Sequence, residues 1–377
     1  MQCRKFGSLD WRASALGFGC MRLPLLNNDS GEIDEREATR MVRHAIDRGL
    51  NYIDTAYPYH RENSERFVGR VLQDGYREKV SLATKLPVWK VNEAEDFDRL
   101  LNEQLGKLQT DHIDFYLLHA LGSERWPMVR DLGVREWLLK ARASGRIRHI
   151  GFSFHDELPV FKEIVDAFEE WDFCQIQYNY IDIENQAGTA GLQYAAARGM
   201  GVVVMEPLLG GRLVNPPEPI QAIWDESPVR RSAADWALQW LWNQPEVSLV
   251  LSGMTAFQQV EENLASAETS SVGKLTPVEQ SLVDRARVKY QELCPVDCTH
   301  CDYCQPCPNQ VNIPRIFELY NQASMYNILP QSRKQYERMP MESRADMCLD
   351  CQECEEKCPQ HIQISSWMPV VHEALAG

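Results

Sequence analysis

The chain has 377 residues, of which 44% are hydrophobic and 25% are charged, a composition typical of folded globular proteins rather than disordered ones. Its 54 acidic residues outnumber the 39 basic ones, giving a net charge of -15, which argues against sequence-independent binding to nucleic acid or to an anionic membrane. No apolar run reaches the ~18 residues of a membrane span, and the N-terminus lacks the apolar stretch of a secretion signal, so we expect a cytoplasmic protein.

Short apolar segments alternate with longer amphipathic ones through most of the chain. The eight expected strands are Ser14–Cys20, Leu50–Asp54, Val80–Thr84, Ile113–Leu118, Ile147–Ser153, Phe173–Tyr178, Gly201–Met205 and Val247–Leu251. The expected helices between them are Glu35–Gly49, Ala94–Leu108, Arg135–Ser144, Glu157–Glu169, Gly188–Arg198 and Ser232–Gln244. Eight β–α units over ~265 residues predict an α/β fold of the (β/α)8 TIM-barrel class. An open doubly wound sheet is the alternative, disfavoured because no Gly-x-Gly-x-x-Gly follows the first strand.

Polar residues close three consecutive strands. The second strand ends in Asp54; Lys85 and His119 directly follow the third and fourth strands, and Tyr59 lies in the loop after Asp54. These strand ends share the rim where barrel enzymes place their catalytic groups. A Lys ammonium lowers the pKa of a nearby Tyr hydroxyl, an Asp holds that Lys in place, and a neutral His can orient a substrate oxygen. Singly, each residue has a structural explanation, such as a helix cap or a surface ion pair. Together they predict proton donation to the alkoxide formed when a carbonyl is reduced.

With these segments the sequence resembles the aldo-keto reductase family. The resemblance implies that Tyr59 is the general acid–base, that Lys85 and Asp54 tune it, and that His119 orients the carbonyl of a small-molecule substrate. It covers nearly all of residues 1–270, including a hairpin at Arg4–Gly7 that closes the bottom of the barrel. It also implies an NADP or NAD cofactor, held by Gly19, Met21, Arg22, Asp54, Ser153, Gln175, Met205, Pro207, Leu208, Gly210, Arg212, Gln259, Glu262 and Asn263.

Two departures from the family pattern concern the cofactor. Met205 replaces a Tyr that often stacks on the nicotinamide, so we expect an apolar face with weaker stacking. The segment Ser252–Gln259 lacks the Lys and Arg that usually grip the 2′-phosphate of NADP. The preference for NADPH over NADH is therefore open, with Gln259 and Arg212 as partial substitutes.

The substrate pocket is less readable from the sequence. Trp89 follows Lys85 and Trp126 follows His119, and each is interpreted either as an apolar pocket wall or as loop packing. The long Pro-rich connection around Asn215–Pro219 is either a functional lid or a surface excursion.

Nine of the 12 cysteines lie between Cys294 and Cys358, after a helix that we expect to start at Thr276 and end near Leu293. We therefore divide the chain into a barrel domain, 1–275, and a linker helix with a small α-helical metal domain, 276–377. Two cysteine runs each end in Cys-Pro, and the second matches the bacterial ferredoxin spacing C-x2-C-x2-C-x3-C-P. In that pattern the cysteine before proline ligates the other cluster. We assign Cys298, Cys301, Cys304 and Cys358 to one [4Fe-4S] cluster and Cys348, Cys351, Cys354 and Cys307 to a second.

Cys294 has no assigned cluster; it is either free or replaces a neighbour. Zinc is the rival interpretation of the paired cysteines, but no His follows at finger spacing. The tail resembles the dicluster ferredoxin-type domain appended to one branch of aldo-keto reductases. Acidic residues at Asp350, Glu353, Glu355 and Glu356 suggest either a docking face for a redox partner protein or an ordinary solvated surface.

Three functions follow from the two parts together. The first is an NAD(P)H-dependent carbonyl reductase whose clusters are structural or regulatory. The second is an electron-transfer protein that uses the barrel with a flavin or a partner, because a nicotinamide gives two electrons and a [4Fe-4S] cluster takes one. The third is a sensor with an inactive barrel, which the complete set of four catalytic residues disfavours.

Overall fold

The structure, a computed structural model, describes residues 1–27 and 29–377. The chain forms two compact units, Met1–Gly210 with Ala234–Thr276, and Gly211–Ala233 with Pro277–Gly377. The connection after the seventh barrel strand thus belongs to the same compact unit as the C-terminal part. The domain boundary at 275/276 stays a prediction.

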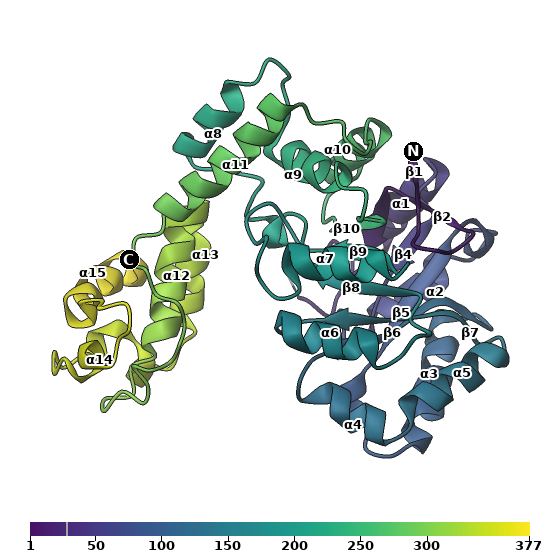
Figure 1. The fold of residues 1–377 in the computed structure, drawn as a ribbon, viewed down its shortest axis with the longest axis horizontal. Coiled ribbons are helices and arrows are strands. Elements are labelled where there is room, and N and C mark those ends of the chain that lie inside the picture. Colours follow the sequence, from purple (N-terminus) through teal and green to yellow (C-terminus); the bar gives the residue numbers. More distant parts are fainter. Residues whose placement is uncertain (28) are drawn as a thin grey trace. The chain divides into compact units, whose positions relative to one another are not determined.

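The first unit is built around a closed barrel of parallel strands in the order β10-β3-β4-β5-β6-β7-β8-β9 (Figure 1). The strands are β3 (Leu16–Gly19), β4 (Tyr52–Asp54), β5 (Ser81–Leu86), β6 (Ile113–Leu121), β7 (Ile147–Phe154), β8 (Phe173–Gln177), β9 (Gly201–Met205) and β10 (Leu249–Gly253). Every predicted strand overlaps one of them. The predicted (β/α)8 class is confirmed, and the open-sheet alternative is wrong.

Helices connect the strands and cover the outside of the barrel. They are α1 (Glu35–Asp47), α2 (Ser64–Val71), α3 (Glu95–Leu108), α4 (Arg125–Asp131), α5 (Val134–Ala143), α6 (Leu158–Asp166), α7 (Gly188–Ala197), α9 (Ala233–Trp242) and α10 (Phe257–Glu268), with short 3-10 turns at η1 (Arg77–Lys79) and η2 (Val88–Lys90). Helix α1 starts where the Asp34 carboxylate accepts a hydrogen bond from the Glu37 N–H at 3.1 Å. No helix in residues 1–27 and 29–377 is long and apolar enough to cross a membrane.

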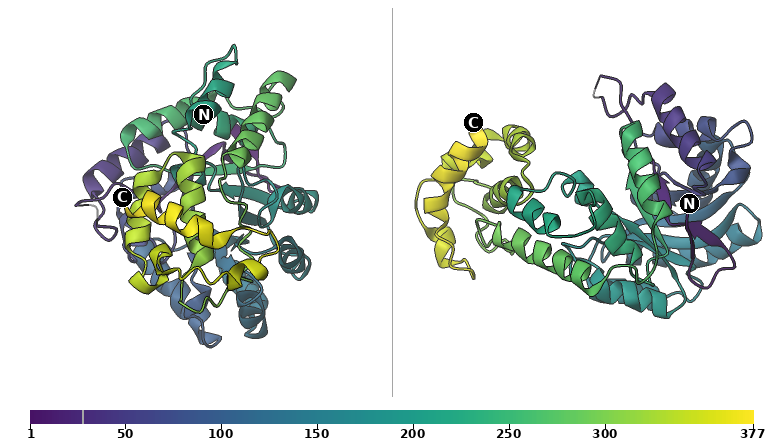
Figure 2. Two further views of the ribbon diagram at one scale, coloured as in Figure 1. Left: turned by 90° about the vertical axis from the view of Figure 1, so that its left-hand side faces the viewer. Right: turned by 90° about the horizontal axis from the view of Figure 1, so that it is seen from above.

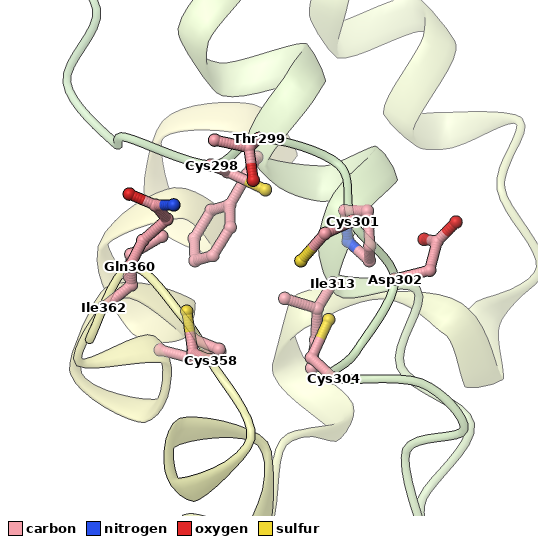
Figure 3. Close-up of a pocket in the computed structure, with 12 residues that line it drawn as sticks. Cys298, Thr299, Cys301, Asp302, Cys304, Ile313, Cys358, Gln360 and Ile362 are labelled. Atoms are coloured by element: carbon pink, nitrogen blue, oxygen red, sulfur yellow. The ribbon is translucent and has the colours of Figure 1, made fainter.

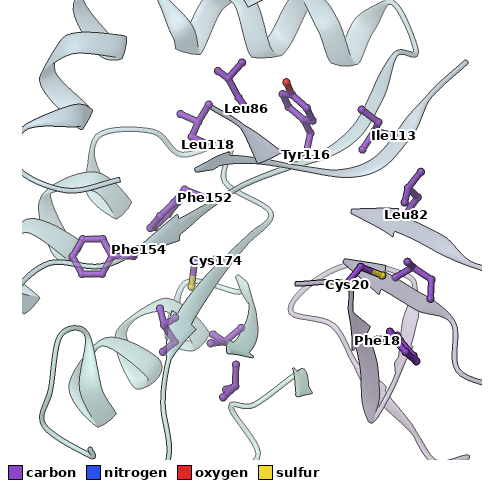
Figure 4. Close-up of a cluster of buried hydrophobic side chains, with 14 of the residues drawn as sticks. Phe18, Cys20, Leu82, Leu86, Ile113, Tyr116, Leu118, Phe152, Phe154 and Cys174 are labelled. Atoms are coloured by element: carbon purple, nitrogen blue, oxygen red, sulfur yellow. The ribbon is translucent and has the colours of Figure 1, made fainter. Parts of the chain in front are cut away.

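Side chains alternate along each barrel strand between the helices and the barrel interior. Outward residues such as Leu82, Tyr116 and Phe152 belong to the core between strands and helices (Figure 4). Inward residues at the start of the strands, including Tyr52, Phe115 and Phe173, fill the interior as a separate cluster. The same period of two makes the polar residues further along these strands face inward. The barrel thus has an apolar floor and a polar upper end.

A two-stranded hairpin closes the floor. Strand β1 (Cys3–Lys5) pairs antiparallel with β2 (Arg12–Ser14). Phe6, which follows β1, is fully buried, and its ring centroid lies 5.1 Å from that of Phe115. The hairpin implied by the family resemblance is therefore present. It also takes Ser14 out of the first predicted strand, because Ser14 pairs with Cys3 and β3 begins only at Leu16.

The second unit is helical. It contains α8 (Glu218–Asp225), α11 (Pro277–Glu292), α12 (Ile313–Tyr326), α13 (Leu329–Glu337), α14 (Glu353–Glu356) and α15 (Ile364–Ala376), with 3-10 turns η4 (Met341–Ser343) and η5 (Ala345–Met347). Figure 2 shows from two sides that α12, α13 and α15, in green to yellow, pack against one another. Helix α8 lies in the long connection and packs on α11, where Arg285 donates two hydrogen bonds of 2.6 Å to the Glu226 carboxylate.

Candidate functional site

A buried ion pair joins the ends of two neighbouring strands. Strands β4 and β5 pair with Asp54 opposite Ala83, so the inward-facing Asp54 and Lys85 side chains meet. The Lys85 ammonium donates to both Asp54 carboxylate oxygens at 2.7 Å and to the Thr55 carbonyl oxygen at 2.8 Å. Lys85 is fully buried and Asp54 is 3% exposed. Burial acts against the ammonium, but Asp54 and Tyr59 outweigh it and raise the pKa of Lys85. Lys85 is therefore a fixed positive charge at neutral pH.

Tyr59 lies beside this charge. The Lys85 nitrogen is 5.1 Å from the centroid of the Tyr59 ring, close enough for its charge to act on the Tyr59 hydroxyl. Burial raises the pKa of Tyr59 above its ordinary value of 10, while Lys85 acts in the lowering direction with a smaller effect. The expectation that Lys85 lowers the Tyr59 pKa describes that one contribution, but desolvation decides the net direction. Tyr59 is consequently a protonated acid at neutral pH.

His119 completes the group on β6. Its ring centroid lies 6.1 Å from that of Tyr59, with the two rings nearly perpendicular. Burial has the largest effect on His119, followed by Lys85, His155 and Arg125, and together they lower the His119 pKa well below 6.5. The imidazole is thus neutral, and its buried Nδ1 has no hydrogen-bond partner within the described residues. A ring nitrogen with unused hydrogen-bonding capacity suits a group that binds a substrate oxygen.

A β-bulge sets the position of His119. Strand β6 does not stop before His119 but continues to Leu121, with one extra residue between Leu118 and Leu121 relative to β7. Ala120, inside the bulge, has a φ of 53°, and its N–H donates to the Ser153 hydroxyl oxygen at 2.7 Å. The sequence does not predict this bulge, because alanine is not a residue type that favours a positive φ. Bulges of this kind re-aim side chains next to active sites.

A second buried layer supports β5 from outside the barrel, and sequence reasoning missed it. Glu65 on α2 is fully buried, and its Oε1 accepts hydrogen bonds from the Thr84 hydroxyl at 2.7 Å and from Gln104 Nε2 at 2.6 Å. Gln104 also donates to the carbonyl oxygen of Lys85 at 3.0 Å. In the sequence, Glu65 has the pattern of an ordinary acidic residue in a first helical turn. Only the fold shows that Glu65 holds Gln104, which in turn binds the backbone carbonyl of Lys85.

The implied nicotinamide residues come together on β7, β8 and β9. Ser153 pairs in register with Gln175, and Gln175 Nε2 lies 3.4 Å from the Met205 sulfur. Gln175 is 2% exposed, and its side-chain oxygen has no partner in the part of the chain described. A buried, unpartnered amide oxygen fits the carboxamide nitrogen of a nicotinamide. The residues present therefore fit this end of the cofactor.

The implied phosphate residues lie around Arg22. A Cβ built on Gly210, which has a φ of 66°, would lie 3.2 Å from the Arg22 guanidinium, and one built on Gly253 would lie 3.2 Å from the Arg22 Cβ. Gly210 lies within η3 (Leu209–Gly211), which follows Pro207 and Leu208. Gly19 ends β3 and Met21 is 57% exposed beside it. Arg22 thus lies in a glycine-walled cradle that can approach a phosphate closely.

The expected adenosine residues sit on or before α10 with internal partners. Gln259 accepts a hydrogen bond from the Thr255 N–H at 2.8 Å, and Glu262 accepts one from Gln258 at 2.7 Å. Asn263 donates to the Ser252 hydroxyl at 3.0 Å. Arg212 belongs to the second compact unit, and its proposed role toward the cofactor stays a prediction.

The two tryptophans considered for the pocket behave differently. Trp89 is 40% exposed, and its ring centroid lies 5.1 Å from that of His119. Trp126 is 1% exposed and packs near Trp171, with the ring centroids 6.2 Å apart. Trp89 is therefore a wall of the site and Trp126 is core packing.

The second unit contains a cysteine-lined pocket. Cys298, Cys301, Cys304 and Cys358 line it together with apolar residues that include Ile313, Phe317 and Ile362. Figure 3 shows the four sulfur atoms directed toward the space between them, three from one loop and one from the distant Cys358. No three His, Cys, Asp or Glu side chains within residues 1–27 and 29–377 are placed to hold a single metal ion. The spacing suits a polynuclear cluster with one thiolate at each corner better than one zinc ion.

The second cysteine run is closely spaced but does not line that pocket. The thiols of Cys348 and Cys351 both act electrostatically on Cys354, after the larger effect of burial, which raises the Cys354 pKa to about 11. Asn309, two residues after Cys307, donates to the carbonyl oxygen of Met347, next to Cys348. Cys294 is outside both groups; its sulfur lies 3.5 Å from the Val296 carbonyl oxygen.

Comparison with known proteins identifies a matching family for each of the two parts of the chain. Residues 15–275 match the aldo/keto reductase family, and residues 297–362 match a 4Fe-4S dicluster domain. L-galactose dehydrogenase of Arabidopsis thaliana is 28% identical over 298 residues, covering 72% of this chain and 90% of that protein. The holo form of aldo-keto reductase AKR11C1 from Bacillus halodurans is 27% identical with a TM-score of 0.64, covering 76% of this chain and 96% of that one. A Klebsiella pneumoniae aldo-keto reductase in complex with NADPH is 23% identical with a TM-score of 0.62, over 76% and 95% of the two chains.

Proposed function

Because the chain belongs to the aldo/keto reductase family, we propose that it is an NAD(P)H-dependent oxidoreductase that reduces an aldehyde or ketone to an alcohol. The observation that carries this proposal is the set of Tyr59, Lys85, Asp54 and His119 at one end of the barrel, with Lys85 held 2.7 Å from Asp54. The cytoplasm is the expected location, since its reducing conditions keep cysteines available for metal.

When bound, a nicotinamide cofactor would supply the hydride for the carbonyl carbon. The residues of this chain manage the proton: the Tyr59 hydroxyl donates it to the carbonyl oxygen, and the phenolate that remains is stabilised by the Lys85 ammonium. Asp54 keeps Lys85 charged and in place. The neutral His119 orients the carbonyl oxygen without competing as an acid. Ser153 and Gln175 would hold the carboxamide, Arg22 a phosphate, and Met205 the face of the ring.

The test is a Tyr59→Phe variant, which keeps the ring and removes the acid. We expect NAD(P)H oxidation in the presence of an aldehyde panel to fall roughly 10²- to 10⁴-fold. Tyr57→Phe is the matched control, because the Tyr57 hydroxyl donates to Glu103 at 2.9 Å and not to the site. Turnover that is equal in the wild type and Tyr59→Phe would contradict the proposed chemistry.

We also propose two [4Fe-4S] clusters with the ligand sets expected from the spacing. The common pocket of Cys298, Cys301, Cys304 and Cys358 supports the first set. The grouping of Cys348, Cys351 and Cys354, and the link from Asn309 to Met347, support the second set with Cys307. Anaerobically purified protein is expected to contain about eight iron and eight sulfide per chain, with visible absorbance that dithionite bleaches. A zinc-loaded, colourless protein would exclude this assignment.

The alternative is an electron-transfer protein in which the clusters exchange electrons with a redox partner. Cys301 and Cys351, one from each proposed set, are exposed, which favours electron exchange at the surface. Carbonyl reduction by NAD(P)H should then depend on the clusters, whereas in the reductase proposal it continues in cluster-free protein. Comparing the two preparations with the same aldehydes decides between them.

A further inference from the structure

Beside the candidate active site lies an arginine that has no carboxylate partner among the residues described. Arg125 begins α4, and its Nη1 donates at 3.1 Å to the carbonyl oxygen of Ala120, the residue after His119. Its Cζ lies 5.5 Å from the centroid of the Trp89 ring, which itself lies 5.1 Å from the His119 ring. Arg125, Trp89 and His119 thus form a continuous wall that leads to Tyr59.

The charge of Arg125 is not neutralised locally. No carboxylate in residues 1–27 and 29–377 forms an ion pair with it, although the chain carries 54 acidic residues. Arg130, on the same helix, does pair with Asp131 at 2.9 Å. The carboxylate of Asp156 instead accepts hydrogen bonds from the N–H and the hydroxyl of Ser123, both at 2.7 Å. A guanidinium has five N–H donors, and one hydrogen bond leaves most of them free for a ligand.

The charges around His119 also indicate a site that attracts an anion. The charged groups that act on His119 are Lys85, His155 and Arg125, and none of them is an acid. Lys85 is neutralised by Asp54, and the pKa of His155 is lowered by burial and by Arg125, so Arg125 supplies the remaining positive charge. Arg125 also lies against an exposed aromatic face rather than in bulk solvent, which strengthens its attraction for an anion.

We propose that Arg125 is a specificity-determining residue that binds an oxyanion of the substrate, and that the substrate class is therefore an aldehyde or ketone carrying a carboxylate or phosphate group. Planar oxyanions accept two parallel hydrogen bonds from a guanidinium. Trp89 would cover the carbon skeleton between this anchor and the carbonyl at Tyr59 and His119. This inference rests on the proposed function, since it places an anionic group relative to a reducible carbonyl.

The experiment compares substrates that differ only in charge. The pairs are para-carboxybenzaldehyde with para-carbamoylbenzaldehyde, and glycolaldehyde phosphate with glycolaldehyde. For each pair the ratio of kcat/KM, anionic over neutral, is measured for the wild type, Arg125→Gln, Arg125→Lys and the matched control Arg130→Gln. We expect the wild type to prefer the anionic member of at least one pair, and Arg125→Gln to lower that ratio roughly 10- to 100-fold, as loss of a hydrogen bond between charged groups implies. Arg125→Lys should recover part of it, and Arg130→Gln should not change it.

The substrate pair in which the anionic member is preferred shows whether the site binds a carboxylate or a phosphate. Ratios near one for both pairs in the wild type, or ratios unchanged by Arg125→Gln, would overturn the inference. If no carbonyl is reduced at all, the proposed function fails separately. In that case, calorimetry measures the binding of para-(hydroxymethyl)benzoate and of its amide to the wild type and to Arg125→Gln. An Arg125-dependent preference for the carboxylate supports the anion site, and equal binding of the two compounds rejects it.

Discussion

At the scale of single residues, the site separates its charges by environment. Lys85 is charged because Asp54 lies 2.7 Å away, whereas His119 is neutral because burial, together with Lys85 and Arg125, lowers its pKa. Tyr59 keeps its proton because burial outweighs the effect of Lys85. One acid, one fixed cation and one neutral hydrogen-bonding group therefore coexist at one pH.

The directions of these pKa shifts predict how the rate of carbonyl reduction depends on pH. The reaction needs protonated Tyr59, whose pKa is raised above 10, so kcat should stay level from about pH 6 to about pH 9 and fall only above pH 10. No limb should appear near pH 6.5, because the lowered pKa of His119 keeps it neutral there. Steady-state rates in buffers of constant ionic strength check this. A decline beginning near pH 8 would mean that Lys85, not burial, controls the Tyr59 pKa.

The Glu65 network gives a second residue-scale prediction. Glu65→Leu leaves the Thr84 hydroxyl and Gln104 amide buried without their shared acceptor, so we expect a loss of about 1–3 kcal/mol in the free energy of unfolding. Lys85 loses backbone support, so kcat should fall more than KM rises. Glu37→Leu, which removes an exposed ion pair with Arg40 on α1, is the control and should change little. Urea unfolding and kinetics on both variants give the comparison.

At the scale of elements, strand alternation and one bulge build the site on top of a closed floor. Gly7, in the hairpin that forms this floor, has a φ of 54°, and a Cβ on it would lie 2.4 Å from the Gly199 carbonyl oxygen. A side chain at this position would therefore have to displace backbone atoms. By contrast, a Cβ on Gly145, which has a φ of 80°, meets nothing within 4 Å.

These two glycines form a matched pair. Both Gly→Ala substitutions carry the cost of a positive φ, roughly 1 kcal/mol, but only Gly7→Ala adds a clash with backbone. We expect Gly7→Ala to lower Tm by several degrees more than Gly145→Ala, and thermal unfolding measures the difference. Equal Tm values would mean that the hairpin does not fix the floor.

At the scale of the whole molecule, the proposed catalytic residues and the proposed cluster ligands belong to different compact units. The apolar core of the second unit includes Ile316, Phe317 and Met368, and Cys298 and Cys358 pack against it. The four proposed catalytic residues, Asp54, Tyr59, Lys85 and His119, all belong to the first unit.

Cluster loss should therefore affect the two units unequally. Cys358→Ser removes one proposed ligand, and we expect iron content to fall and the helical circular dichroism signal to decrease. The rate of Tyr59-dependent carbonyl reduction should stay within about twofold of the wild-type rate, because none of the four proposed catalytic residues is altered. Cys3→Ser, at an exposed cysteine outside the second unit, is the control for both readouts. Loss of reduction together with iron would favour the electron-transfer alternative.

The sequence by itself determined the barrel, its strands and the polar residues that end them, because buried strands and amphipathic helices leave strong periodic patterns. It also determined the cysteine spacing, since cluster ligands lie close together along the chain. Tertiary structure decided what depends on neighbours distant in sequence. Burial reversed the expected direction of the Tyr59 pKa, the bulge at Ala120 placed His119 within a strand, and packing separated Trp89 from Trp126. Within the described residues, it also left Arg125 beside Trp89 without an acidic partner. Desolvation and pairing are sums over surrounding atoms, and only the folded chain brings those atoms together.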